Sequence, residues 1–117
     1  MAQLVTPERI EQRLLSLSSL LDSAQDHLEK VEQEYAQKKS LYEIGMAEAR
    51  IKLGSSETKL RVQEIEDNAL IQCKDRYWEL NMSEALVKAA RSDIIRLRTQ
   101  VDIARSIGTS VRAAMEL

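Results

Sequence analysis

Apolar residues recur along the first half of the chain in alternating steps of four and three residues. The series is Ile10, Leu14, Leu17, Leu21, Ala24, Leu28, Val31 and Tyr35. This spacing is a heptad seam, which is typical of a helix that packs against another helix in a coiled coil. After Lys38 the seam resumes as Tyr42, Met46, Ala49 and Leu53, with two successive steps of four that locally unwind a supercoil.

Both ends of this first helix carry recognisable signals. Thr6 can cap the helix with its hydroxyl, and Pro7 suits the first helical position, where no N–H is needed. At residues 53–57 the sequence reads LGSSE. Gly54 can take the left-handed conformation that ends helices, and Ser55 or Ser56 can cap the next one. The sequence therefore predicts a helix over about 6–53 and a turn at about 54–56.

A second heptad seam follows, and between this turn and Gly108 there is no glycine or proline. Its positions are Leu80, Ser83, Val87, Ala90, Ile94, Leu97, Val101, Ala104, Gly108, Val111 and Met115. The pattern predicts a second helix over about 56–115. The apolar register is less regular between Ile65 and Leu80. A break at 66–68, which would give three helices instead of two, is the open alternative.

Two long helices joined by a short turn pack antiparallel, so we expect an all-α helical hairpin forming one domain over 1–117. Residue i of the first helix should then face roughly residue 110 minus i of the second. The acidic start of the first helix would lie along the basic end of the second, which favours this pairing. The second helix is the longer, so about a dozen C-terminal residues should overhang.

The predicted overhang is apolar, and a bare two-helix hairpin buries little surface. We therefore predict a homo-oligomer that assembles through the hairpin flanks and the overhang. The residues predicted to build the subunit contact are Ile103, Ile107, Val111, Met115 and Leu117.

The composition offers little material for catalysis. His27 is the only histidine and Cys73 the only cysteine, and no phosphate-binding glycine loop is present. We therefore expect a protein that is not an enzyme and has no metal site, cofactor or small-molecule substrate. A single cysteine, the lack of a signal-peptide pattern and apolar runs too short to cross a bilayer predict a cytoplasmic protein with no membrane partner.

The charged residues contain one regular feature. Arg91, Arg98, Arg105 and Arg112 recur every seven residues, with Arg96 as an extra arginine. Such a row can form interhelical ion pairs, or it can follow the phosphates of a nucleic acid without reading bases.

The expected register decides which arginines have acidic neighbours. It places Arg98 near Glu11 and Arg91 near Ser18, and it leaves Arg105 and Arg112 beyond the first helix. Lys38 and Lys39 belong to a second basic zone nearer the turn. The residues predicted to bind DNA are these two lysines and Arg91, Arg96, Arg98, Arg105 and Arg112.

The segment from Tyr77 through SEALVKAARSDIIRLRTQVDIARSIGTSVRAAMEL resembles small helical proteins encoded beside recombination genes in tailed phages. More remotely it is similar to the UvsY family of T-even phage recombination mediators. That family forms oligomeric helical hairpins that bind single-stranded DNA while loading a recombinase. The resemblance implies that Arg96, Arg98, Arg105 and Arg112 contact the DNA backbone and that Ile107, Val111 and Met115 build the oligomer.

We therefore expect a phage-type recombination mediator that binds single-stranded DNA. By resemblance, it would help a recombinase to displace a single-strand-binding protein, in the bacterial cytoplasm if the protein is phage-encoded. The alternative is a coiled-coil scaffold or inhibitor that binds a host protein through an acidic face and binds no DNA. That face comprises Asp22, Asp26, Glu29, Glu32 and Glu34.

Overall fold

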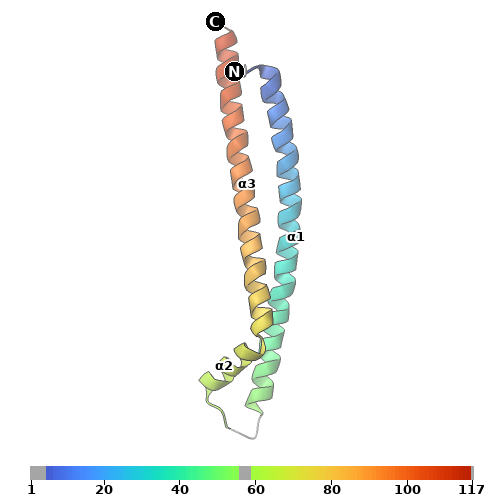
Figure 1. Cartoon of the computed structure of the whole chain (residues 1–117), viewed down its shortest axis with the longest axis vertical. Helices are drawn as coiled ribbons and strands as arrows, with labels where there is room; N and C mark the ends of the chain where they lie inside the picture. Colours follow the sequence, from blue (N-terminus) through green and yellow to red (C-terminus); the bar gives the residue numbers. More distant parts are fainter. Residues whose placement is uncertain (1–4, 56–58, 117) are drawn as a thin grey trace. The chain divides into compact units, whose positions relative to one another are not determined.

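The computed structural model describes residues 5–55 and 59–116, and all secondary structure among them is α-helical. It contains α1 (Pro7–Gly54), α2 (Val62–Gln72) and α3 (Lys74–Met115), shown in Figure 1. The prediction of an all-α protein built on long packed helices is confirmed. The expected first helix agrees with α1 to within one residue at each end.

Contacts divide the chain into two compact units. The terminal unit comprises Met1–Glu29 and Ala89–Leu117, and the junction unit comprises Lys30–Lys88. Each unit has its own cluster of buried apolar residues. The expectation of one domain over 1–117 stays a prediction.

The cap predicted for α1 is present. The N–H of Arg9 donates to the Thr6 hydroxyl oxygen over 3.3 Å, and the N–H of Ile10 donates to the Thr6 carbonyl oxygen over 3.1 Å. Thr6 thus accepts two of the N–H groups that have no partner inside the first turn.

The terminal unit pairs the start of α1 antiparallel with the end of α3, the blue and red ribbons of Figure 1. Its core contains Leu17, Leu97 and Ala104, and Leu17 is completely buried. Leu14, Leu21, Ala24 and Val101 pack against these three residues. All seven lie on the predicted seams, because a heptad spacing keeps one face of each helix toward its partner.

The end of α1 differs from the prediction. Among the described residues no glycine has a positive φ, so Gly54 does not take the left-handed conformation. The Ser55 hydroxyl instead donates to the carbonyl oxygens of Ile51 and Lys52, over 3.0 and 3.1 Å. Ser55 therefore closes α1 and does not cap the next helix, and the helix end needs no reversed backbone. Ser56 lies outside the described residues.

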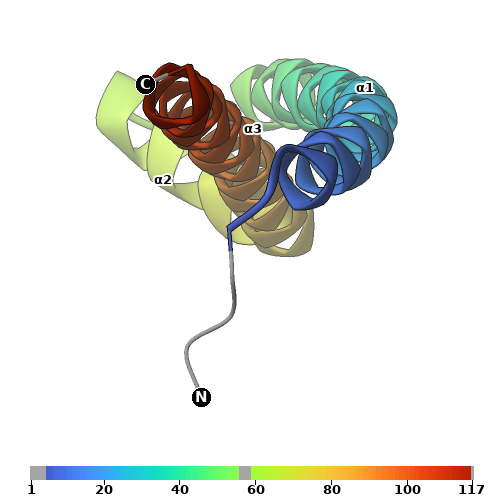
Figure 2. The same cartoon turned by 90° about the horizontal axis from the view of Figure 1, so that it is seen from above.

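The single helix predicted over 56–115 is two helices. Residues 59–61 are not helical, α2 begins at Val62 without a side-chain cap, and the chain breaks again at Cys73. The backbone of Cys73 has φ −100° and ψ 16°, and Figure 1 shows α2 at an angle to the first turns of α3, which Figure 2 views from above. The open alternative of three helices is confirmed for the described residues, but its break at 66–68 is misplaced, because residues 66–68 lie inside α2.

Cys73 itself is buried, together with Met46, Ala49 and Ala69. The break in the helix therefore lies where α2 and α3 both pack on α1. No proline or glycine causes it; packing against α1 at this point accounts for its position.

The antiparallel register differs from the predicted one. The expected pairing placed residue 100 opposite Ile10, whereas Gly108 packs there, 3.2 Å from the Ile10 side chain when a Cβ is built on the glycine. The prediction assumed one continuous helix from residue 56, whereas α2 begins at Val62 and α3 begins at Lys74. Within the terminal unit, α1 meets later residues of α3 than predicted.

This shift shortens the predicted overhang. Ala104 and Gly108 were expected beyond the end of the first helix, but both are buried. Ala104 packs with Leu17, deep inside the terminal unit. The last dozen residues therefore do not project as a block.

Candidate nucleic-acid interface

The four heptad-spaced arginines all lie on α3 in the terminal unit, and all four are exposed. A spacing of seven residues places side chains on one edge of a helix, about 10 Å apart. We call this edge, formed by Arg91, Arg98, Arg105 and Arg112, the arginine edge. Its members differ in what surrounds each guanidinium.

Arg98 borders a groove of about 340 Å³ between α1 and α3. The groove is lined by Gln25, Leu28, Arg91, Ile94, Ile95 and Arg98. The sequence predicted Glu11 as the neighbour of Arg98, whereas the observed register brings it to the groove bordered by Gln25. The polar group of α1 at this groove is therefore a neutral amide.

Arg98 and Arg105 share one property. Within the part of the chain that the structure describes, neither guanidinium makes a hydrogen bond or an ion pair. Each can therefore bind an external anion without first breaking a contact. The prediction that Arg105 has no acidic partner within the hairpin agrees with this arrangement, although Arg105 does not lie beyond α1.

Arg112 was predicted to project beyond the first helix, but it lies beside the start of α1. It lines a cavity of about 100 Å³ together with Pro7, Ile10 and Glu11, among others, and its Nε donates to the Gly108 carbonyl oxygen over 3.3 Å. The shifted register thus brings Arg112, and not Arg98, close to Glu11. A nearby carboxylate and an existing hydrogen bond make Arg112 a weaker candidate for binding phosphate.

Arg96 does not belong to the arginine edge. It is two residues from Arg98, so the two side chains leave α3 about 160° apart. Arg96 Nη2 lies 3.3 Å from Asp93 Oδ1, within the same helix. The sequence-based set of DNA-binding residues therefore includes one arginine on another face.

The second basic zone is part of the junction unit. Lys38 Nζ lies 3.1 Å from Glu79 Oε2, so this lysine joins α1 to α3. Lys39 is exposed. The Lys38 ion pair is an interhelical contact, and Lys38 must break it before it can bind phosphate.

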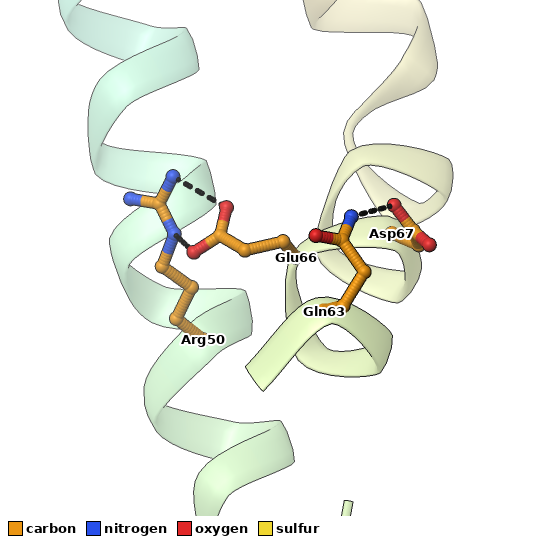
Figure 3. Close-up of polar contacts among 4 residues, drawn as sticks. All are labelled: Arg50, Gln63, Glu66 and Asp67. Atoms are coloured by element: carbon orange, nitrogen blue, oxygen red, sulfur yellow. Dashed lines mark hydrogen bonds and ion pairs between the residues drawn. The ribbon is translucent and has the colours of Figure 1, made fainter. Parts of the chain in front are cut away.

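The junction unit also contains an ion pair between α1 and α2. Arg50 Nε lies 2.8 Å from Glu66 Oε1, and Arg50 Nη2 donates to Glu66 Oε2 over 3.0 Å, as Figure 3 shows. The hydrogen bond to Glu66 raises the pKa of Arg50 above its usual value. Sequence analysis missed this pair because it depends on where α2 begins. A neighbouring Gln63–Asp67 hydrogen bond of 2.9 Å stays within α2.

A close approach of α3 to α1 occurs at Gly45, and it too was missed. Arg76 Nη1 donates to the Leu41 carbonyl oxygen over 3.2 Å. A Cβ built on Gly45 would lie 2.5 Å from that Nη1 and 3.4 Å from Cys73 Sγ. The available signal was a glycine inside a helical pattern, which often marks close packing.

The described residues predicted to form the oligomer follow one another at steps of four along α3. Ile103 and Ile107 are exposed neighbours one turn apart on α3. Met115 is also exposed, whereas Val111 is half-buried within the terminal unit. Leu117 lies outside the described residues.

Over residues 5–55 and 59–116, no group of three or more His, Cys, Asp or Glu side chains is placed to hold a metal ion. A search of the same residues found no helix with the length and apolar character that crossing a membrane requires.

Comparisons of the chain with protein-family models, with curated proteins and with solved structures found no match.

Proposed function

We propose that this protein is a non-enzymatic recombination mediator of the phage type, an oligomer that binds the backbone of single-stranded DNA through its arginine edge. In this role it assists a recombinase in replacing a single-strand-binding protein. The observation that carries the proposal is the pair Arg98 and Arg105. Both are exposed on one edge of α3, and neither guanidinium has a partner among the described residues.

The electrostatic argument follows from that pair. Unpaired guanidinium groups about 10 Å apart match a chain of phosphates, because each can bind one without reading a base. The 89–117 segment carries five arginines against three acidic residues, so its own balance is positive although the chain as a whole has net charge −2. Binding should therefore depend strongly on salt.

The oligomer is the second part of the proposal. Ile103 and Ile107 leave apolar side chains at the surface of α3, 54% and 44% exposed. Exposed apolar side chains grouped together usually have a protein partner. Several copies would present several arginine edges to one strand, which raises the effective affinity without new contacts.

The first experiment measures the anisotropy of a labelled single-stranded oligonucleotide titrated with protein at about 50 and 200 mM salt. Each phosphate contact with a single strand changes the slope of log K against log salt by about 0.7. We expect the variant with both Arg98→Gln and Arg105→Gln to bind at least tenfold more weakly at the lower salt, with a slope smaller by about 1.4.

The matched control is Arg96→Gln, which removes an arginine from another face of the same helix. It should bind the oligonucleotide almost as tightly as the parent protein. An unchanged affinity in the double variant, or an equal loss in the control, would exclude the arginine edge as the binding site.

The mediator role rests on the resemblance and needs its own assay. Labelled DNA is first covered with a bacterial single-strand-binding protein, and recombinase loading is then followed with and without this protein. We expect faster loading with the parent protein and little acceleration with the double variant. Equal acceleration by the parent protein and the double variant would show that mediation does not depend on DNA binding by Arg98 and Arg105.

A specific observation favours a second candidate, a protein-interaction module that binds no DNA. Trp78, Met82 and Leu86 follow one another at steps of four on α3 in the junction unit and are 64%, 46% and 48% exposed. Tryptophan and methionine are enriched in protein interfaces. The same anisotropy titration distinguishes the two candidates, because this one predicts no oligonucleotide binding at either salt concentration.

A further inference from the structure

We propose that the groove beside Arg98 seats one nucleobase of a bound single strand, while Arg98 and Arg105 hold phosphates of the same strand. This inference rests on the proposed function and adds a contact that selects single-stranded over duplex nucleic acid.

Three of the residues that line the groove are apolar. Ile94 is buried, Leu28 is half-buried and Ile95 is 64% exposed. Ile95 lies three residues before Arg98 on α3, and residues three apart are neighbours on a helix surface. An exposed isoleucine beside an unpaired guanidinium therefore offers two kinds of surface together, an apolar face and a cation.

A nucleotide needs both kinds of surface. Its phosphate binds a guanidinium, and the face of its base stacks on an aromatic ring or the plane of an arginine, or packs against an aliphatic side chain. The groove volume of about 340 Å³ lies at the lower end of the range for small-molecule sites, roughly 300–1,000 Å³. We infer that it accepts one base and not a stack of several.

The geometry also excludes a paired base. In a duplex the faces of each base are covered by its neighbours, and only base edges are accessible in the grooves. A site that contacts a face therefore requires an unstacked strand. Gln25 borders the groove with an amide that can both donate and accept hydrogen bonds, so it can bind the edge of any of the four bases. We expect little sequence preference.

A different occupant, an acidic amphipathic helix of a partner protein, would use Arg98 and Ile95 in a similar way. Two observations favour the nucleotide. The groove is bounded by a second helix, α1, which limits its size, and its polar rim contains a neutral amide that suits a base edge.

The test compares three labelled probes of equal length: an oligothymidine, a strand of abasic deoxyribose phosphates, and a duplex. A base that packs against an isoleucine removes less flat surface from water than one stacked on an aromatic ring, so its contribution is smaller. We expect the parent protein to bind the oligothymidine about fivefold more tightly than the abasic strand. We also expect Ile95→Ala to lose most of that difference without changing the salt slope.

The matched control is Ile44→Ala, which truncates an exposed isoleucine of α1 outside the groove. It should keep the preference for the oligothymidine. Circular dichroism checks that both variants remain helical, which is expected because neither side chain is buried.

The outcomes separate this inference from the proposed function. Equal, salt-sensitive binding of the oligothymidine and the abasic strand overturns the base site but leaves backbone binding intact. Binding of none of the probes overturns both. Binding of an acidic helical peptide, lost in Ile95→Ala and without any oligonucleotide binding, assigns the groove to a protein partner and also overturns both.

Discussion

Arg76 donates a hydrogen bond from its guanidinium to the main-chain carbonyl oxygen of Leu41, over 3.2 Å, and thereby ties the first turn of α3 to the middle of α1. Gly45 makes the approach possible, because a Cβ at that position would lie 2.5 Å from Arg76 Nη1. A glycine inside a helix costs about 1 kcal/mol relative to alanine. At this position the cost is offset by the close contact of α1 with α3.

The two glycines of α1 allow a matched pair of substitutions. Gly54→Ala adds a methyl group to open space and should stabilise the protein by up to about 1 kcal/mol. Gly45→Ala gains the same helix propensity but must move the flexible end of the exposed Arg76 side chain and break its hydrogen bond, a loss of about 0.5–1.5 kcal/mol. We expect Gly45→Ala to be neutral or destabilising in urea unfolding. Equal stabilisation by both substitutions would contradict this account.

Two leucines of α1 should differ sharply in their contribution to stability. Leu17 is fully buried in the core of the terminal unit, whereas Leu15 is 72% exposed. Leu17→Ala should lower the free energy of unfolding by about 2–5 kcal/mol. Leu15→Ala should change it by about 0.5 kcal/mol or less. Denaturant titrations at one fixed protein concentration measure both, since an oligomer's stability depends on concentration. Similar losses would mean that Leu15 is covered in an assembly.

The stability of the junction unit should fall at alkaline pH because of Tyr42. Its burial, and next the nearby Tyr77, raise the pKa of Tyr42 above its usual value of 10.0. Above about pH 10 the unfolded chain therefore loses the phenolic proton more readily than the folded one. The contribution of Tyr42 to the free energy of unfolding is complete below that pH. It is lost as the pH rises through the pKa that the Tyr42 hydroxyl has in the folded state.

Unfolding of the parent protein and of Tyr42→Phe at about pH 8 and pH 11 measures this effect. The parent should lose more stability between the two pH values than the variant, because phenylalanine has no proton to lose. Identical losses would show that Tyr42 has the same pKa in both states. The ring centroids of Tyr42 and Tyr77 are 5.6 Å apart. Phenylalanine keeps the aromatic ring at position 42, so the comparison isolates the effect of the hydroxyl group.

The Arg50–Glu66 pair should hold α2 on α1. Arg50→Gln removes the charge and the two short contacts to Glu66, so α2 should open more often and its amide hydrogens should exchange faster. Gln63→Ala is the control, because the Gln63–Asp67 bond does not leave α2. Hydrogen exchange followed by mass spectrometry gives the comparison. Equal protection of α2 in the parent and Arg50→Gln would show that apolar packing alone holds this helix.

Much of the helical packing follows from the heptad pattern. Leu17, Leu97 and Ala104 are buried because seven-residue spacing places them on one face, whatever the partner helix is. The Thr6 cap is equally local, since it needs only the four residues that follow it. Such features depend on neighbours in sequence, so the sequence alone predicts them.

The break at Cys73 could not be predicted in the same way. The sequence there contains no proline or glycine, and the residues that surround the break, Met46 and Ala49 among them, come from α1. Similarly, Gly54 carries a strong signal for a left-handed turn, yet the Ser55 hydroxyl satisfies the last carbonyl groups instead. Local propensity was overridden where a second segment or a competing hydrogen bond was available.

The candidate site also combines features that follow from the sequence with features that depend on tertiary packing. The sequence by itself determined that Arg91, Arg98, Arg105 and Arg112 share one edge of a helix, because helical geometry requires it. Only the tertiary structure decided that Arg112 meets Glu11 while Arg98 borders an apolar groove. Heptad seams still match after one helix slides by seven residues along the other. The packing of Ile10 against Gly108 and of Leu17 with Ala104 defines one of these registers, and with it the surroundings of each arginine.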